Sequence, residues 1–277
     1  MWHLPRPFHS AAHSYAAVVA TTRSVERRKL LLEAIPTVRK AGHELRRAAV
    51  ESTLHDLDEK DFAVPGIDGD TFVEWAYDNG MSAKKGKRIR DELMAAPRNK
   101  RCPLCSQGTV YELDHFVPKS LYPALCVDPL NLVPACERCN KLKGSMQPRS
   151  AEDTLLHPYL DRISHERWLD ARTVHEPDFV RLEFFVSPPD TWDTTLTRRV
   201  ENHFGLLQLG QRYAPVANNL IYGMEARWDE LRRRRGGSML RDHLLEDAAS
   251  WFRKDPNSVE GVTCATLADD EVFCRTG

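Results

Sequence analysis

The sequence predicts a mainly α-helical protein with a small core of two strands and one helix that a zinc ion holds together. The first observation is a pair of Cys-x2-Cys motifs, here called the two knuckles, which bracket the middle of the chain. The second is the helical spacing of apolar residues on both sides of the knuckles. The third is a composition of 42% hydrophobic and 29% charged residues over 277 positions, which suits a globular protein with its own core. We expect three regions: a helical N-terminal region over 1–99, the core over 100–161 and a mainly helical C-terminal region over 162–277.

The N-terminal region is expected to be mostly helical. One helix should span about residues 14–35 and end before Pro36, because proline does not continue a helix. The next helix carries apolar residues at three- and four-residue spacing: Val38, Ala41, Leu45 and Ala48. Residues 65–69 predict a turn. Residues 4–7 predict an extended arm that docks elsewhere on the protein.

The knuckles are expected to bind one zinc ion. Zinc prefers four soft or borderline ligands in a tetrahedron, and thiolates at this spacing supply them. The expected ligands are Cys102, Cys105, Cys136 and Cys139. Disulfides are the alternative, but the chain shows no secretory signal and has seven cysteines. Three cysteines fall outside the pattern and are interpreted as buried or free thiols: Cys126, Cys264 and Cys274.

A short strand is expected between the knuckles, over residues 110–115. It ends on Asp114 and His115, and Pro118 follows soon after, which is typical of a strand that stops. Neighbouring strand residues point to opposite faces, so the strand has to end or twist here if both side chains serve one site. Residues 131–133 predict a second short strand.

After Pro134 the chain is expected to enter a helix through the second knuckle. Four residues of this helix share one face: Cys136, Cys139, Asn140 and Lys143. Zinc bound by the knuckles would therefore hold the start of the helix that carries Asn140 and connect it to the strand that carries His115.

This set of residues resembles the core of the HNH, or ββα-metal, endonuclease family. The likeness rests on Cys-x2-Cys, Asp-His-x-x-Pro, Asn-Leu and Cys-x2-Cys-Asn-x2-Lys in this order, over about residues 100–147. It implies that His115 is the general base and that Asn131 pins the loop that orients it. It also implies that Asp114 and Asn140 hold a divalent cation. Asn140 stands where the family name has a histidine, which is a common variant in the family.

Phosphodiester hydrolysis calls for the same side chains on chemical grounds. Histidine can take a proton from water near neutral pH, and a cation stabilises the charge that develops on the phosphate. Asp114 supplies a charged oxygen and Asn140 a neutral one, and oxygen ligands favour Mg²⁺ or Mn²⁺. The alternative is a zinc module in which Asp114 and His115 are incidental. The ordered presence of both asparagines counts against it.

The net charge of −1 is not that of a free-standing DNA-binding protein. Phosphate affinity then has to come from a local patch or from a partner. Residues 84–101, here called the basic patch, hold eight basic and two acidic side chains and run into the first knuckle. The residues expected to contact nucleic acid are Lys84, Lys85, Lys87, Arg88 and Lys143. A solvated helix face is the alternative for the patch, and we prefer it for Lys141.

The C-terminal region predicts one strand, over residues 180–186, and three helices. The helices are expected at about 192–208, through 216–228 and at about 238–253. The apolar positions expected to face the core are Val216, Leu220, Met224 and Trp228, then Leu240, Leu244, Ala248 and Trp251. His157, just before this region, either extends the active site or packs at a turn, and we favour the turn.

A second, broader resemblance concerns the whole arrangement. The helical leader, Asp-His-Phe-x-Pro-Lys-Ser, Asn-Leu-x-Pro-Ala-Cys, a His-Pro-Tyr segment and a helical tail are similar to the HNH nuclease subunit of Septu-type anti-phage systems and some retron effectors. The resemblance implies an ABC-type ATPase partner that regulates the nuclease. A partner that presents the nucleic acid or restrains the enzyme would also explain the near-neutral charge.

The sequence therefore predicts a metal-dependent endonuclease of host defence that cleaves DNA to 5′-phosphate and 3′-hydroxyl ends, as the family implies. One alternative is the same site acting on RNA or tRNA. The other is a non-catalytic zinc module that binds nucleic acid or a partner protein. No membrane span or signal peptide is visible, and reduced cysteines with zinc predict a cytoplasmic protein.

Overall fold

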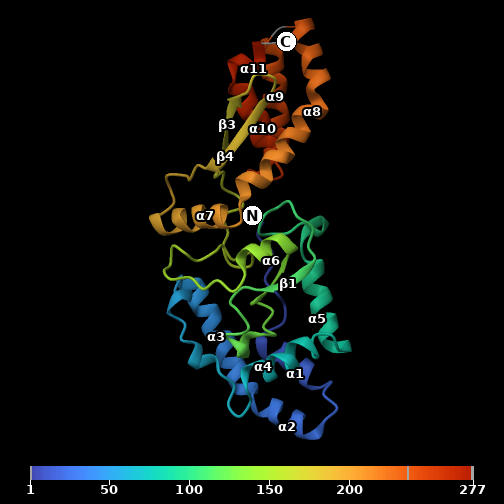
Figure 1. The fold of residues 1–277 in the computed structure, drawn as a ribbon, viewed down its shortest axis with the longest axis vertical. Coiled ribbons are helices and arrows are strands. Elements are labelled where there is room, and N and C mark those ends of the chain that lie inside the picture. Colours follow the sequence, from blue (N-terminus) through green and yellow to red (C-terminus); the bar gives the residue numbers. More distant parts are fainter. Residues whose placement is uncertain (1, 236, 276–277) are drawn as a thin grey trace. The chain divides into compact units, whose positions relative to one another are not determined.

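The computed structural model describes residues 2–235 and 237–275 and divides the chain into two compact units, Met1–Arg162 and Ile163–Gly277. Figure 1 shows their elements. Within the described residues helices dominate, and the strands form two separate two-stranded sheets. The expected mainly helical class is confirmed. None of the described helices combines the length and the apolar character that crossing a membrane requires.

The first unit begins with a run of helices. They are α1 (Ala11–Val19), α2 (Val25–Glu33), α3 (Ile35–Glu51), η1 (Leu54–Asp56), η2 (Glu59–Phe62), α4 (Gly69–Val73), the π-helix η3 (Glu74–Asp78), α5 (Lys84–Ala95) and η4 (Arg98–Lys100). The expectation of one helix over about 14–35 is wrong. Ser24 is extended and its side chain accepts a hydrogen bond from the backbone N–H of Arg27, which starts a new helix, α2.

Three local predictions for this region are confirmed. Pro36 lies in the first turn of α3, where its missing N–H breaks no helical hydrogen bond. The predicted stripe of α3 is buried: Val38, Ala41, Leu45 and Ala48. The turn predicted at 65–69 is present over 65–67, and Gly66 has a φ of 76° there, a conformation that favours glycine.

The N-terminal arm docks on the middle of the chain, as expected. The backbone N–H of Trp2 donates to the carbonyl of Pro103 at 2.9 Å, and that of Leu4 donates to the carbonyl of Pro158 at 2.8 Å. Leu4 is buried. Leu4 thus anchors the predicted arm, and Trp2, just before it, ties the chain to the first knuckle.

Two strands and a helix follow the first knuckle. They are β1 (Glu112–His115), β2 (Leu132–Ala135) and α6 (Glu137–Lys143), with η5 (Pro123–Leu125) between the strands. The strands pair antiparallel, with His115 opposite Leu132. β1 ends at His115, and α5 packs against both strands. The hairpin is buried apart from its first residue, so its polar side chains lie in the interior of the unit.

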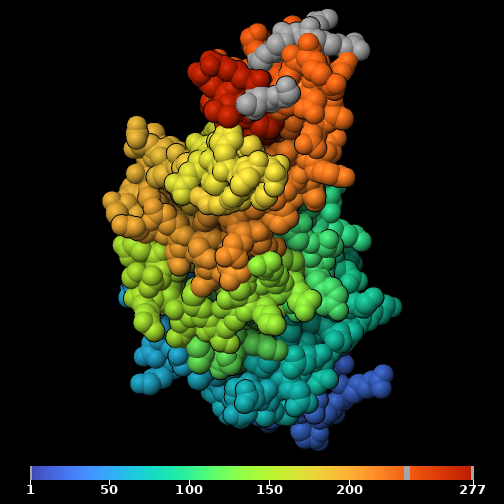
Figure 2. Space-filling view, turned by 45° about the horizontal axis from the view of Figure 1, so that its top comes forward, coloured from blue at the N-terminus to red at the C-terminus, as the bar shows by residue number. Residues whose placement is uncertain are grey.

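The second unit contains one hairpin and five described helices. They are β3 (Leu169–His175), β4 (Val180–Val186), α7 (Thr194–Leu206), α8 (Leu209–Arg235), α9 (Gly237–Phe252), α10 (Val259–Asp269) and α11 (Glu271–Arg275). The strand predicted at 180–186 is present, but the prediction missed its antiparallel partner β3 and the last two helices. Figure 2 shows the hairpin, in yellow, on the surface of this unit.

The buried faces of α8 and α9 correct part of the prediction. On α8 the buried residues include Tyr213, Ala217 and Trp228, whereas the predicted Val216, Leu220 and Met224 are only half-buried. A strict four-residue step drifts about 40° around a helix each time, so the four predicted positions spread over about 120° and only the last, Trp228, is fully buried. On α9 Leu240, Leu244 and Ala248 are buried as expected, but Trp251, in the last turn, is 41% exposed.

Candidate metal centre and active site

The four knuckle cysteines meet in one buried cluster. Cys102 and Cys105 come from the loop after η4, and Cys136 and Cys139 from the start of α6. Their sulfur atoms all lie within 4.8 Å of one another, and the Sγ atoms of Cys105 and Cys136 are 3.9 Å apart. Zinc–sulfur bonds of about 2.3 Å in a tetrahedron place the sulfurs about 3.8 Å apart. The cluster can therefore hold a zinc ion, and it is the one such group of metal-binding side chains among the described residues.

The backbone of the first knuckle can stabilise a thiolate. The backbone N–H of Gly108 donates to Cys105 Sγ at 3.3 Å, and such a bond favours the charged form of the sulfur. Ser106 has a φ of 61°, so the turn between the knuckle and Gly108 is tight. No disulfide forms in the described part of the chain, and Cys126, Cys264 and Cys274 are buried thiols outside the cluster, as expected.

His115 lies at the end of β1, with its ring almost completely buried. Its Nε2 is 2.9 Å from the carbonyl oxygen of Cys126. A carbonyl only accepts, so Nε2 carries the proton and Nδ1 carries the lone pair. Burial lowers the pKa of His115 to about 4, so the ring is neutral at pH 7. The arrangement produces a neutral imidazole of fixed tautomer whose Nδ1 can accept a proton.

Asn131 holds the loop between the two strands. Its Oδ1 accepts a hydrogen bond from the backbone N–H of Val117 at 2.8 Å. Its Nδ2 donates to the carbonyl of Val117 at 3.1 Å and to that of Leu125 at 3.3 Å. Leu125 precedes Cys126, whose carbonyl accepts from His115. The fully buried asparagine thus positions the backbone group that fixes the histidine tautomer.

Asp114, the residue before His115, is buried, and only one of its two carboxylate oxygens has a partner. Its Oδ1 is 3.2 Å from the Lys143 ammonium group, while its Oδ2 is buried without a hydrogen-bond partner. Burial raises the pKa of Asp114 to about 6, against the opposite effect of Lys143. A buried carboxylate oxygen with no partner is costly, unless a group absent from the protein chain satisfies it.

Lys143 corrects an expectation. The predicted phosphate contact needs an exposed ammonium group, but this side chain is 3% exposed. Its Nζ donates to the carbonyl of His115 at 2.8 Å and to that of Gly144 at 3.2 Å, and it pairs with Asp114. The buried lysine therefore has a structural role, because its contacts connect α6 to the end of β1.

We expect Lys143→Met to lower the free energy of unfolding by about 3–5 kcal/mol, because it leaves the Asp114 carboxylate buried without its cation. Lys141 is exposed on the same helix, so Lys141→Met should stay within about 0.5 kcal/mol of wild type. Urea titrations of the two variants measure the difference. Equal losses would show that the buried ion pair contributes nothing of its own.

The remaining predicted residues lie at the surface of α6 and α5. Asn140 is half-buried on α6, next to Cys139 of the cluster. The basic residues of α5 are exposed: Lys84, Lys85, Lys87 and Arg88. Lys87 is 3.6 Å from Asp91, and Arg88 is 3.0 Å from Glu92, so part of the basic patch is neutralised on its own helix. Lys84 and Lys85 make no ion pair with the described residues.

Two residues near His115 were missed by the sequence analysis. The Tyr77 and His115 rings pack edge to face, with ring centres 4.5 Å apart. The Lys119 ammonium group lies 4.6 Å from the centre of the Tyr77 ring and 3.0 Å from Asp78. Tyr77 belongs to the π-helix η3, a rare element that often marks functional sites, but its position in the sequence gives no sign of this.

His157 packs at a turn, as favoured. Its ring centre is 4.2 Å from that of Phe116, and its backbone N–H donates to Asp161 at 2.6 Å. The side chain is buried. It therefore supports the residue that follows His115.

Two curated proteins are similar to parts of this chain. The first is Protein ea31 of Escherichia phage lambda, 32% identical over 146 residues, which are 51% of this chain and 49% of that protein. The second is Septu protein PtuB of Bacillus thuringiensis, 34% identical over 91 residues, which are 31% of this chain and 35% of that protein. The similar part spans about half the length of one relative and about a third of the other. No protein-family model and no solved structure matches the chain.

Proposed function

We propose that this protein is a metal-dependent HNH endonuclease that hydrolyses DNA and acts in anti-phage defence. The observation that carries the proposal is His115, which is buried, neutral and fixed through Nε2, together with its chain neighbour Asp114, whose Oδ2 is buried without a hydrogen-bond partner. The order of the Asp-His, Asn and Cys-x2-Cys-Asn motifs supports the HNH class. The partial similarity to Septu protein PtuB supports the defence role.

In the proposed reaction His115 accepts a proton from water through Nδ1 while the water attacks the phosphorus atom, and the bond from phosphorus to the 3′ oxygen breaks, which leaves a 5′-phosphate and a 3′-hydroxyl end. Its neutral ring is ready for this step at pH 7, because burial disfavours the imidazolium form. The Cys126 carbonyl holds the ring in place, and Asn131 holds that carbonyl's segment. Because the loop between the strands already holds the His115 ring in place, less free energy is needed to orient the base before each turnover.

The residues present fit a hard divalent cation. Asp114 Oδ2 is a buried carboxylate oxygen without a hydrogen-bond partner, and Asn140 supplies the neutral oxygen of the motif. Asp114 and Asn140 would hold Mg²⁺ or Mn²⁺. When bound, such an ion stabilises negative charge on the phosphate and on the leaving oxygen.

The zinc site is proposed to be structural. Four thiolates fill a tetrahedron and leave no open position for substrate. The ion would connect the loop after η4 to the start of α6, and so set the distance between the two strands and Asn140. We propose residues 100–161 as the nuclease core, with helical regions on both sides.

The basic patch on α5 is proposed to follow the phosphate backbone, and the free cations Lys84 and Lys85 test this. Changing both to glutamate should weaken DNA binding and make the slope of log K against log salt shallower by about 0.9 for each phosphate that is no longer neutralised. Fluorescence anisotropy with a labelled duplex at several salt concentrations measures both quantities.

The matched control is the same charge change at Arg28 and Lys29, two exposed basic residues of α2. It should weaken binding only slightly and leave the salt slope unchanged. If both double variants change the slope equally, the patch has no special role and the effect is one of net charge.

The partner is proposed to be an ABC-type ATPase subunit, since the chain itself is near neutral and its motifs resemble the nuclease of two-component defence systems.

RNA cleavage by the same site is the second enzymatic candidate. Plasmid nicking and cleavage of a labelled RNA, each with and without added Mg²⁺ or Mn²⁺, separate the two substrates. Binding without any cleavage would favour a non-catalytic zinc module.

A further inference from the structure

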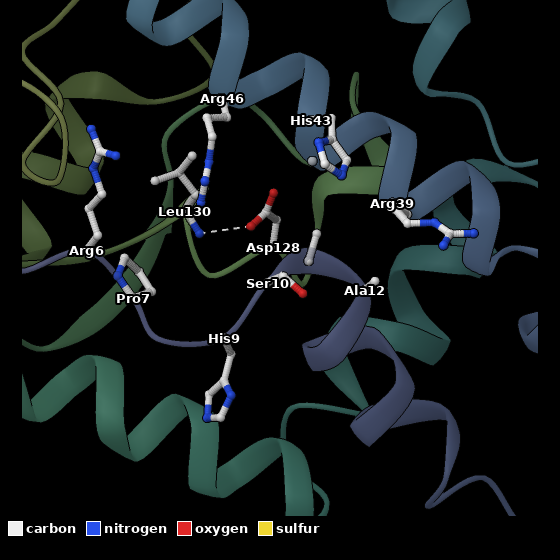
Figure 3. Close-up of a pocket in the computed structure, with 12 residues that line it drawn as sticks. Arg6, Pro7, His9, Ser10, Ala12, Arg39, His43, Arg46, Asp128 and Leu130 are labelled. Carbon is white, nitrogen blue, oxygen red and sulfur yellow. Dashed lines mark hydrogen bonds between the residues drawn. The ribbon is translucent and has the colours of Figure 1, made fainter.

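A cavity of about 170 Å³ lies within the first unit. Its walls come from the N-terminal arm, from α1 and α3, and from the loop before β2 (Figure 3). None of the proposed catalytic residues lines it. The cavity is therefore separate from the proposed active site, although it shares the β1–β2 loop with it.

The rim of this cavity is rich in cations. Three arginines line it, and none makes an ion pair or hydrogen bond with the described residues: Arg6, Arg39 and Arg46. All are exposed, and so is His43, which also lines the cavity. In Figure 3 the side chains of His43 and Arg46 extend from α3 on either side of Asp128. A rim of guanidinium groups suits a phosphate, which accepts their paired donors.

Asp128 is the one acidic residue that lines the cavity, and it is 3% exposed. Its Oδ1 accepts the backbone N–H of Leu130 at 2.9 Å, while Oδ2 has no hydrogen-bond partner among the described residues. Gly42 gives this oxygen its room, because a Cβ there would lie 3.0 Å from it. Burial raises the pKa of Asp128 to about 6, against the opposite effects of the Leu130 N–H and of the nearby Arg46 and His43, so the carboxylate is still mostly ionised at pH 7. The floor of the cavity thus offers a carboxylate oxygen that can accept a hydrogen bond from a ligand.

The arginines at the rim favour an anion, whereas Asp128 favours a hydrogen-bond donor, so one ligand should carry both groups. A bare phosphate fits the arginines but is repelled by Asp128, whereas an uncharged donor leaves the arginines unused. A nucleotide has both, a phosphate and a base with an amino group. Pockets for whole drug-sized ligands occupy about 300–1,000 Å³, so a cavity of about 170 Å³ admits the base and leaves the phosphate at the rim.

We propose that this cavity binds a nucleotide, with its phosphate on the rim arginines and an amino group of its base on Asp128. If the proposed function holds, this site is also connected through the backbone to Asn131 of the proposed active site. The carbonyl of Asp128 accepts the backbone N–H of Asn131 at 2.9 Å and that of Leu132 at 3.0 Å. A ligand held by Asp128 would stiffen the loop that carries Asn131.

Calorimetry on the full chain, without divalent cations, tests the binding itself. The probes are AMP, ribose 5-phosphate, inorganic phosphate and a short oligo(dA). AMP should bind more tightly than ribose 5-phosphate or phosphate. Arg46→Ala should weaken AMP binding about tenfold, the loss expected when one charge-assisted hydrogen bond is removed.

Arg47→Ala is the matched control, one position further along α3. Arg47 pairs with Glu44 at 2.6 Å and with Glu51 at 3.4 Å, so its removal should leave AMP binding unchanged. Asp128→Asn keeps the shape of the side chain but replaces the free oxygen with a donor. It should remove the preference for AMP over ribose 5-phosphate.

Tighter binding of oligo(dA) than of AMP, with the same dependence on Arg46, would support the site and identify its nucleotide as part of a strand. No AMP binding at millimolar concentration, or equal losses for Arg46→Ala and Arg47→Ala, would overturn the proposal. Circular dichroism checks whether Asp128→Asn is folded. Arg46 is exposed, so its variant should fold and tests the site in any case. Since the readout involves no cleavage, a failed nuclease assay leaves this result intact, and the reverse also holds.

Discussion

His115→Ala should abolish DNA cleavage, with a loss of at least about 10²–10⁴-fold, the usual contribution of a general base. The variant removes the only group that the proposed mechanism uses to take a proton from water. It should also cost about 1–3 kcal/mol of stability, because the buried carbonyl of Cys126 loses its donor. Plasmid nicking in Mg²⁺ or Mn²⁺, together with a thermal melt, measures both effects.

His157→Ala is the matched control for this experiment. The two histidines are buried in the same region, but His157 packs on Phe116 and has no chemical role in the proposal. Its variant should lose stability to a similar degree and keep cleavage below its melting temperature. Wild-type cleavage by His115→Ala would remove the HNH mechanism, and the zinc-module alternative would take its place.

The other site residues should follow a defined order. Asp114→Ala should also lose activity, because it removes the charged ligand of the cation. Asn140→Ala should be severe but partly rescued by high metal concentration, since the charged ligand stays. Asn131→Ala should be intermediate, because it loosens the segment that holds His115 without removing the base.

Loss of zinc should unfold the first unit. Structural zinc contributes about 10–16 kcal/mol of apparent binding free energy in small zinc domains, more than the usual stability of a protein domain. Cys136→Ser removes one thiolate of the cluster and should give poorly soluble protein without zinc. Elemental analysis of purified wild type should find one zinc per chain.

Cys264→Ser is the control for the zinc experiment. Cys264 is also buried, but it lies on α10 in the second unit, outside the cluster. Its replacement should leave the zinc content unchanged and cost little stability. Folded wild-type protein without zinc would contradict the metal site, and equal defects in the two variants would mean that any buried cysteine matters as much.

The cysteine cluster, the short hairpin and the helix after it were predictable because their signals are local. Metal-ligand spacing, the stop of β1 after His115 and the helical spacing around Cys139 depend on residues a few positions apart. The partner strand β3 and the last two helices were missed, since β3 mixes polar and apolar residues without clear alternation. The break between α1 and α2 was missed because one capping serine decided it.

By itself, the sequence determined the four cysteines of the candidate zinc site, the candidate Asp114–His115 pair and the mainly helical class, because each rests on residue types at fixed spacing. Only the tertiary structure decided what surrounds them. It buried Lys143 against Asp114, placed Tyr77 on His115 across a separation that no motif records, and brought the N-terminal arm, α3 and Asp128 around one cavity. The pKa values of Asp114, His115 and Asp128 depend on burial and on contacts between residues far apart in the sequence. Neither burial nor such contacts can be read from the order of residues along the chain.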